Sequence, residues 1–341
     1  MADFDGFNKK ICSYLMKFLS KRKLLCALLI AHAWIDMTNV VHAQDFPNKP
    51  LKFIVGFPAG GSADIISRLL AQKLSERLNQ TVIVEQRIGA TGLIANDFVV
   101  KSPPDGYNMV LLSGGHPVSA AIMQKLPYDP VRDFGMVTTV IGYPMVILVS
   151  KDSPIKSLYD LLSRAKATPG KISYSSAGIG SLHHLSGEWI SSEAEVSMLH
   201  VPFKGGGPAL IELLAGRIDV MIETSTFAFG QIRGGKVRGL ASTASTRSPL
   251  MPELPTLAET LPGLDFSSWL GLAVSPGTPS SVVDKINREM QVILQMDDVQ
   301  KRFTELGGTS IHSSPTQMRD RIEREIAIWK RIVEIKKIER Q

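Results

Sequence analysis

LKFIVGFPAGGSADIISRLLAQKLSERL, residues 51–78, is the stretch of sequence that decides the fold. It opens with an apolar run, Phe53–Phe57, whose length and composition predict a buried strand. It closes with isoleucines and leucines that recur every three or four residues, which predicts an amphipathic helix. Between them, PAGGS at 58–62 turns the chain sharply and leaves backbone N–H groups free where the helix begins. Such a place is suited to an anion.

This glycine loop does not have a nucleotide-binding pattern. Gly56 and Gly61 are spaced as in a phosphate loop, but Ser62-Ala63 stands where a Lys-Ser/Thr pair belongs, and the chain has no G-x-G-x-x-G fingerprint. The alternative is that the glycines only permit a tight turn between strand and helix. The rest of the chain has to decide between an anion site and a simple turn.

Residues 1–43 have the pattern of a secretory signal peptide. A basic segment, 17–23, precedes the apolar run Leu24–Ile35, and the small-residue site Val41-His42-Ala43 follows. We expect cleavage after Ala43 and export to the periplasm, with Met16 as an alternative start of the chain. The apolar run is shorter than the roughly 20 residues of a membrane span, so an uncleaved membrane anchor is the weaker alternative.

Composition excludes several classes of function once this segment is removed. Both cysteines, Cys12 and Cys26, lie in it, so the mature chain would have no disulfide and no thiolate chemistry. The segment also holds six of the 38 Lys and Arg residues and three of the 32 Asp and Glu residues, so the net charge falls from +6 to about +3. No basic cluster remains, and nucleic acid is not expected as a partner. The remaining length suffices for two lobes.

Strands and helices alternate after the opening unit, which predicts parallel βαβ units. The strands are expected at 81–85 and 108–112, with a helix at Leu93–Val100 between them. Ligands of such sheets bind at the carboxyl ends of the strands. The loop Ser113-Gly114-Gly115-His116 should therefore line the same crevice as 58–62. His116 is either a ligand contact or a turn residue before Pro117.

A second unit of strand, glycine loop and helix is predicted later in the chain. After an apolar run at 145–149 and a helix at 157–167, a strand at 171–175 leads into the loop Ser176–Gly180 and a helix at 181–191. A third glycine loop, Phe203–Pro208, precedes a short helix and the strand 218–222, which ends at Glu223. Further predicted elements are a return strand at 269–274 and helices at 280–295 and 315–335.

These elements predict an α/β protein of two lobes. The expected organisation is a signal peptide at 1–43, a discontinuous first lobe at 44–144 and 270–341, and a second lobe at 145–269. The two chain crossings, near Pro144 and Ser268, would act as a hinge.

Catalytic and metal-binding patterns are missing from the sequence. There is no G-x-S-x-G elbow and no H-E-x-x-H motif. His183 and His184 are neighbours on a helix, so their side chains diverge by about 100°. We therefore expect no catalytic residue, no metal and no cofactor, and we interpret His184 as a hydrogen-bonding residue at a helix start. Lys204 and Glu223 are either an acid–base pair or, more simply, a charge in the cleft and its partner.

The residues favour the capture of an anion. Backbone N–H groups at Gly60–Ser62 and Gly178–Ser181 can bind a carboxylate, helped by the hydroxyls of Ser62, Ser113, Ser176 and Ser181. Phe57 either forms a wall of this site or belongs to the core at the end of its strand.

Taken together, these stretches resemble the Bug-type extracytoplasmic solute receptors of tripartite tricarboxylate transporters. The resemblance runs in order over residues 46–335 and rests on FPAGGSAD (57–64), PDGY (104–107), LPYDP (126–130), SSAGIGS (175–181), HVPFKG (200–205), AGRIDV (215–220) and SPGTP (275–279). It implies a two-lobed periplasmic binding fold of type II, with mixed sheets flanked by helices. It also implies a cleft that closes on a small carboxylate, and delivery of that ligand to membrane permease subunits by a monomeric receptor that is not an enzyme.

Carried over residue by residue, the resemblance implies three ligand loops and two further cleft residues. The implied ligand-binding residues are Phe57, Ala59, Gly60, Gly61, Ser62, Asp64, Ser113, Gly114, His116, Ser176, Ala177, Gly178, Gly180, Ser181, His184, Lys204 and Glu223. The sequence departs from the family pattern at Ala59, around His116, at Ile179 and at Glu223-Thr224. The changes at Ile179 and Glu223 suggest a ligand less anionic than citrate, such as a monocarboxylate or an amino acid. Two alternatives stay open, a receptor that presents its ligand to a membrane kinase and an exported enzyme on the same fold.

Overall fold

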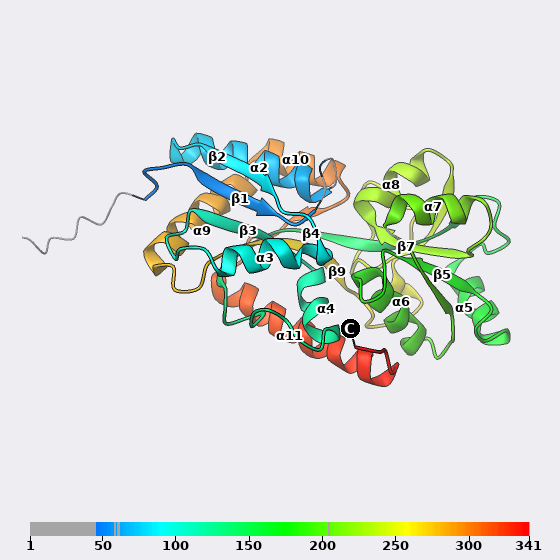
Figure 1. Cartoon of the computed structure of the whole chain (residues 1–341). Coiled ribbons are helices and arrows are strands. Elements are labelled where there is room, and N and C mark those ends of the chain that lie inside the picture. The colour runs from blue at the N-terminus through cyan, green and yellow to red at the C-terminus, as the bar shows by residue number, and fades with distance from the viewer. Residues whose placement is uncertain (1–45, 58, 60–61, 204, 341) are drawn as a thin grey trace, which may run out of the picture. The chain divides into compact units, whose positions relative to one another are not determined.

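The computed structural model describes residues 46–57, 59, 62–203 and 205–340, without the side chain of Ser62. The predicted signal peptide, Gly60, Gly61 and Lys204 therefore lie outside the described residues. The compact unit of the chain is Lys49–Gln341, and the elements below belong to it (Figure 1).

The first sheet combines parallel and antiparallel pairs of strands. Strands β1 (Leu51–Val55), β2 (Val82–Gln86) and β3 (Asn108–Ser113) are parallel, and β9 (Ser267–Val274) pairs antiparallel with β3. The order is β2-β1-β3-β9-β4, where β4 is the long strand Gly135–Ser150, and the short β10 (Thr309–Ser310) also pairs with β4. The predicted βαβ units are confirmed by this arrangement.

The second sheet has the same parallel core. Strands β5 (Ser173–Ser176), β6 (Leu199–Pro202) and β7 (Val220–Thr224) are parallel to one another, and β7 continues the sheet to β4. Strand β8 (Val237–Ser242) pairs antiparallel with β4 as well. The carboxyl ends of β5, β6 and β7 therefore lie along one edge.

Strand β4 belongs to both sheets. Residues 135–144 pair with β9, and residues 145–150 pair with β7 and β8. The apolar run noted at 145–149 is only the last part of this strand, which is 16 residues long. Pro144 suggests a break but sits at the last pair with β9, where the strand changes partners and a missing N–H is tolerated. The two predicted crossings lie side by side here, since Tyr143 is paired with Ser268.

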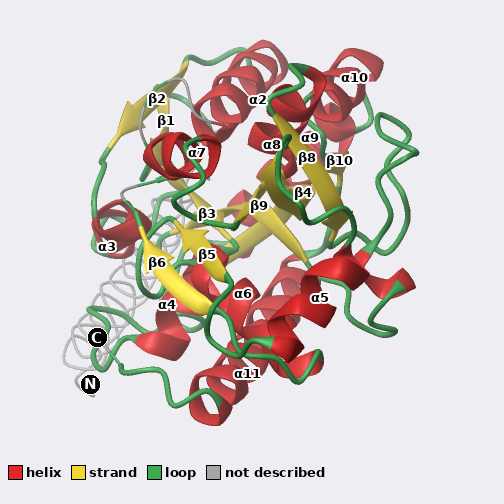
Figure 2. Ribbon diagram, turned by 90° about the vertical axis from the view of Figure 1, so that its right-hand side faces the viewer, coloured by secondary structure: helices red, strands yellow, loops and turns green. Residues whose placement is uncertain are grey.

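Helices cover both sides of the strands (Figure 2). The α-helices are α2 (Ser62–Leu78), α3 (Leu93–Val100), α4 (Gly115–Ile122), α5 (Leu158–Ala167), α6 (Leu182–Glu193), α7 (Gly206–Leu214), α8 (Ser225–Arg233), α9 (Ser280–Leu294), α10 (Asp297–Glu305) and α11 (Pro315–Ile335), with short 3₁₀ helices η1 (Ala90–Gly92) and η2 (Leu257–Glu259). Several starts are fixed by the local sequence. The Ser157 hydroxyl accepts a hydrogen bond from the N–H of Asp160 at the start of α5, and Ser314 and Gln317 form a capping box at the start of α11.

The apolar side chains form separate cores around the two sheets. One core surrounds the first sheet and contains Ile54, Val110 and Trp269. In the second sheet, Met145, Ile147 and Val149 of β4 point into one core, whereas Val146 and Leu148 point into another. This alternation follows from the two-residue period of a strand.

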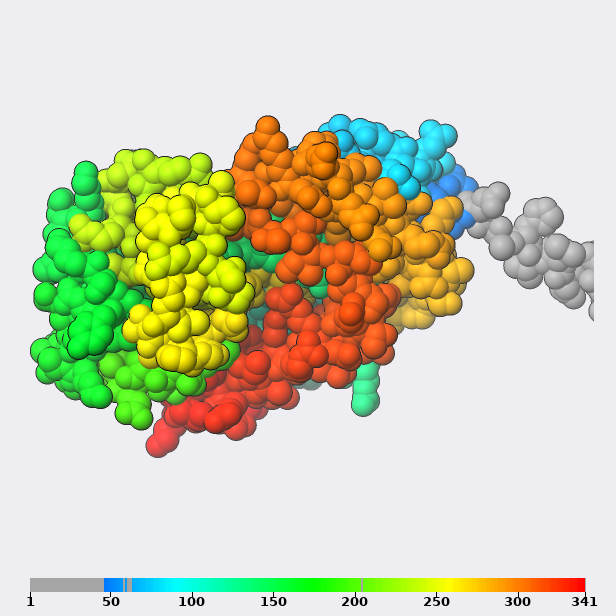
Figure 3. Space-filling model, turned by 180° about the vertical axis from the view of Figure 1, so that it is seen from behind, coloured from blue at the N-terminus to red at the C-terminus, as the bar shows by residue number. Residues whose placement is uncertain are grey.

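Helix α11 packs against both parts of the molecule, as Figures 1 and 3 show. Its first turns place Met318 and Ile322 in the core of the first sheet, and its last turns place Trp329, Ile332 and Val333 in a core of the second. The ring of Trp329 meets that of Trp189 of α6 edge-on, with a centroid distance of 5.4 Å. The indole N–H of Trp269 donates to Glu325 of α11 over 2.8 Å.

Candidate functional site

The candidate site is built at the carboxyl ends of the parallel strands. In the second sheet, β5, β6 and β7 run directly into the loops and helix starts of α6, α7 and α8. The predicted loops 113–116 and 176–181 lie next to each other. A Cβ atom added to Gly114 would lie 3.4 Å from Leu182 Cδ2, and one added to Gly180 would lie 3.0 Å from Ile122 Cδ1.

The loop 176–181 is held by its own hydrogen bonds. Ser176 Oγ accepts the N–H of Gly178 over 3.1 Å, and His184 Nδ1 accepts the N–H of Gly180 over 3.2 Å. The N–H of Ser181 donates to the carbonyl of Gly178 over 3.2 Å. Gly178 and Gly180 have φ angles of 119° and 73°, which favour glycine.

These contacts correct the predicted set of anion-binding donors. Three of the four N–H groups from Gly178 to Ser181 are already used within the loop. Among the described residues, no acceptor takes the N–H of Ile179, and the first N–H groups of α6, at Leu182 and His183, have no partner within the helix. The donors available to an anion are therefore those of Ile179 and of the first turn of α6.

Two stacked histidines, His184 and His200, contact the loop 176–181. The rings of His184 and His200 lie 3.8 Å apart at an angle of 16°, and His200 Nε2 lies 2.6 Å from Ser176 Oγ. Burial lowers the pKa of each histidine to about 4. Both rings are therefore neutral at pH 7, which His184 Nδ1 requires to accept the N–H of Gly180. His184 is confirmed as a hydrogen-bonding residue of the helix start.

Glu223 and His183 form the charged part of the site. The imidazole Nε2 of His183 lies 2.9 Å from Glu223 Oε1, which also accepts the N–H of Thr224 over 2.8 Å. Burial acts to raise the pKa of Glu223, but His183 and Thr224 together lower it below its usual value. For His183, burial acts to lower the pKa, and the carboxylate raises it above its usual value. The two side chains are therefore an ion pair.

The residues predicted after β1 are only partly described. Phe57 is half-buried, and its ring lies 3.7 Å from the position of a Cβ on Gly92. Ala59 is exposed. The carboxylate of Asp64 is buried and accepts hydrogen bonds from Arg68 and Gln86, each over 3.0 Å. Asp64 therefore fixes the start of α2 against β2.

The loop after β3 differs from its prediction. Residues 115–122 form helix α4 rather than a simple turn, and the N–H of Gly114 is used by the carbonyl of Trp269. His116 is buried, and its Nε2–H donates to the carbonyl of Pro130 over 2.8 Å. Its ring stacks on Tyr128. The side chain of His116 thus belongs to the core, so a ligand contact from this residue would have to come from its backbone. Ser113 Oγ accepts the N–H of Gly115 over 3.3 Å.

Sequence reasoning missed His183 and His200 as parts of the site. His183 had been considered only as a metal ligand. His200 reaches the loop through the register of β6 on β5, where it is paired with Tyr174, and no sequence signal gives this register. Tyr143 is buried where β4 crosses between the sheets, and its burial raises the pKa of its hydroxyl.

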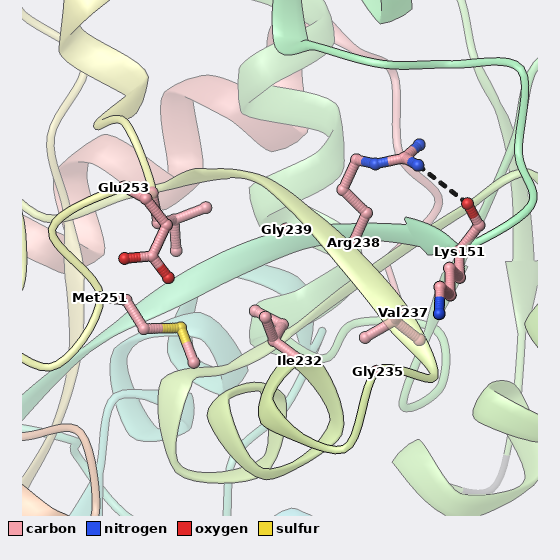
Figure 4. A pocket seen from close by; sticks show the side chains of 9 residues that line it. Lys151, Ile232, Gly235, Val237, Arg238, Gly239, Met251 and Glu253 are labelled. Carbon is pink, nitrogen blue, oxygen red and sulfur yellow. Dashed lines mark hydrogen bonds between the residues drawn. The ribbon is translucent and has the colours of Figure 1, made fainter.

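Two cavities lie elsewhere on the molecule. A cavity of ≈ 300 Å³ lies beside β8 and α8, with Ile232, Met251 and Leu254 in its wall and Lys151 and Glu253 on opposite sides (Figure 4). None of the predicted ligand residues lines it. A second cavity, of ≈ 170 Å³, lies between α6, the start of β9 and α11, and Gly114 is the one predicted residue in its wall. Neither cavity coincides with the loop 176–181.

Metal and membrane features are also missing from the described part of the chain. No group of three or more His, Cys, Asp or Glu side chains is arranged there to hold a metal ion. No helix in the same residues is long and apolar enough to cross a bilayer.

The order of the strands, the shared β4 and the helix starts along the strand ends define the class of the protein. It has the two-lobed α/β fold of periplasmic binding proteins. A family model described as "Tripartite tricarboxylate transporter family receptor" matches residues 66–338. The chain belongs to this family of solute-binding receptors.

Known proteins of similar sequence and structure agree with this assignment. A protein from the tcbD-tcbE intergenic region of Pseudomonas sp. strain P51 is 34% identical over 317 residues, which are 92% of this chain and 94% of the relative. The structure of R. palustris Rpa4515 with adipate has a TM-score of 0.77 at 32% identity and covers 85% of this chain and 98% of its own. MatC of Rhodopseudomonas palustris with bound malate has a TM-score of 0.75 at 31% identity, covering 84% and 100%. The periplasmic binding protein BugD has a TM-score of 0.76 at 31% identity, covering 87% and 100%.

Proposed function

We propose that this protein captures a small carboxylate between its two lobes and delivers it to the membrane permease of a tripartite transporter. The observation that carries this proposal is the loop 176–181, which is fixed by its own hydrogen bonds and presents open N–H donors at Ile179 and at the start of α6. Donors of this kind bind a carboxylate without burying an opposing charge. The structural relatives with adipate and malate bind ligands of the same chemistry.

The proposal includes the organisation of the chain. Residues 1–43 act as a cleaved signal peptide, the receptor works as a periplasmic monomer, and the lobes consist of 44–144 with 270–341 and of 145–269. The predicted ligand residues at 57–64 and 113–116 complete the site from the first lobe, and Lys204 and Glu223 contribute from the second. Intact mass measured on the protein recovered from the periplasm checks the cleavage after Ala43.

Ligand binding is tested by thermal stability. The full chain is produced with its own N-terminal segment, unfolded and refolded to remove bound ligand, and heated with mono-, di- and tricarboxylates and amino acids. A ligand at 100 times its dissociation constant adds about 2.7 kcal/mol to the stability of the folded state. We expect a clear shift of the melting temperature with one class of carboxylates. A flat response to the whole panel would contradict the proposal.

Two N-cap serines of the same lobe provide a matched pair of variants. Ser181 Oγ accepts the N–H of His184 at the start of α6, and Ser157 Oγ accepts the N–H of Asp160 at the start of α5. Either Ser→Ala change removes one helix cap and lowers the free energy of unfolding by about 1 kcal/mol. We expect Ser181→Ala to weaken the ligand-induced shift as well, because the first turn of α6 supplies the donors. Ser157→Ala should leave that shift unchanged.

A further inference from the structure

The carboxylate of Glu223 has one oxygen that the protein does not use. Oε1 accepts hydrogen bonds from His183 and from the backbone and hydroxyl of Thr224. Oε2 accepts none from any of the described residues. It lies against the first turn of α7, where a Cβ atom on Gly206 would come within 2.4 Å of it.

No side chain comes from residues 205–207 beside this oxygen, because all three are glycine. Cβ atoms added to Gly205 and Gly207 would meet nothing within 4 Å. Glu223 ends β7 on the edge where β5 and β6 also end, and its partner His183 lies in the first turn of α6. The free oxygen therefore lies on the same edge as the open N–H donors of the loop 176–181.

The surroundings keep this group an acceptor. His183 and the hydrogen bonds of Thr224 hold the carboxylate in its charged form, and the start of α7 adds the positive end of a helix dipole. A charged carboxylate has lone pairs only, so it can accept hydrogen bonds and cannot donate them. A second carboxylate placed against Oε2 could share no hydrogen bond with it, because both groups carry lone pairs only, whereas an N–H or O–H group could donate to it.

We propose that Glu223 Oε2 selects the ligand, accepting a hydrogen bond from a monocarboxylate that carries an amide, hydroxyl or ammonium group away from its carboxylate. This inference rests on the proposed function, because it assigns the second end of the same ligand. It also separates this chain from the relatives with bound adipate and malate, whose ligands carry two carboxylates. A wrong ligand that leaves a buried polar group without a hydrogen-bond partner is rejected, which is a common source of specificity.

Matched ligand pairs test the inference. Succinate, glutarate and adipate are each compared with their own monoamide by titration calorimetry on the stripped full chain. Each pair differs in one terminal group and in little else. We expect the wild-type protein to bind at least one monoamide about tenfold or more tightly than its diacid. A diacid bound as tightly as its monoamide, or more tightly, would overturn the inference.

Variants of two glutamates then locate the selection. In Glu223→Gln the amide can donate a hydrogen bond to a ligand carboxylate, so the preference for the monoamide should disappear or reverse. Glu212→Gln removes one negative charge from the surface of α7, where Glu212 pairs with Arg217, and should keep the wild-type preference. An unchanged preference in Glu223→Gln would assign the selection to another residue and overturn the inference.

The two proposals can fail separately. If neither member of any pair binds, and the carboxylate panel is also flat, the receptor proposal falls and this inference falls with it. If diacids bind well, the receptor proposal stands and only the role of Glu223 is lost. The wild-type comparison needs no variant, so it decides the inference even if Glu223→Gln does not fold.

Discussion

At the scale of single residues, the site depends on a few close approaches. Gly206 is the clearest case, because its Cα lies directly against the free oxygen of Glu223. Gly206 is needed for space and not for backbone freedom. Of the three glycines 205–207, only Gly205, which precedes the helix, has a positive φ.

This close approach yields a prediction with its control one residue away. In Gly206→Ala the new methyl would come within 2.4 Å of Glu223 Oε2, so the carboxylate must move. We expect ligand affinity, measured by titration calorimetry, to fall about tenfold, because the acceptor is displaced. Gly207→Ala meets nothing within 4 Å and should keep the affinity, with stability equal or up to about 1 kcal/mol higher. Equal affinities for the two variants would contradict the placement of Glu223 in the site.

The residue scale is also where sequence reasoning had its limits. Glycine loops, a helix-start serine and the role of His184 were readable, because they depend on neighbours in the chain. The pairing of His183 with Glu223 joins residues 40 positions apart, and the stack of His184 on His200 needs the register of β6 on β5. His116 looked like a cleft residue, and only the positions of Pro130 and Tyr128 turn it into a core residue.

At the scale of elements, the sequence predicted the boundaries of those helices that begin and end at recognisable turn or cap residues. Helix α3 and helix α11 begin and end as predicted, since periodic apolar residues and turn or cap residues mark both. The apolar run 145–149 marks only the last part of β4, because the partner strands that pair with its full length come from distant parts of the chain. Helix α4 was missed because it is short and opens with Gly-His-Pro, which resembles a turn.

Helix α11 gives the prediction that belongs to this scale. Trp329 is 4% exposed and packs on Trp189 and Phe266. Trp329→Ala would leave a large gap between α11 and α6, and we expect it to lower the free energy of unfolding by about 3–5 kcal/mol. Ile328→Ala removes a side chain that is 38% exposed on the same helix. This change should lower the free energy of unfolding much less. Denaturation by urea measures both, and similar losses would contradict the bridging role of the last turns.

At the scale of the whole molecule, neutral histidines set the response to acid. Burial lowers the pKa of His116, His184 and His200 to about 4, from 6.5 for the unfolded chain. Between these values the unfolded state binds protons that the folded state does not. The stability present above pH 6.5 is therefore lost as the pH falls toward 4. His183 acts in the opposite sense, because its pKa is raised in the folded state: its contribution to stability is present below the unfolded pKa of about 6.5 and is lost as the pH rises above it.

The expected change of the free energy of unfolding with pH is large enough to measure. Each of the three histidines can contribute about 1.4 kcal/mol per pH unit. Urea denaturation at pH 7.5, 6 and 5, values chosen to bracket the unfolded pKa of about 6.5, should show a falling free energy of unfolding. His116→Gln keeps a donor toward Pro130 and removes one titrating group, so its slope should be shallower by about one third. A wild-type stability that does not change with pH would show that these rings are not held neutral.

The position of α11 also determines the surroundings of the tryptophan side chains in the described part of the chain. Every tryptophan among the described residues touches this helix: Trp329 lies on it, Trp269 is bonded to Glu325, and Trp189 packs against Trp329. Indole emission responds to the polarity and packing around the ring. Intrinsic fluorescence therefore reports on a helix that packs into cores of both sheets, and a rearrangement of these cores can be followed in solution without attaching a dye.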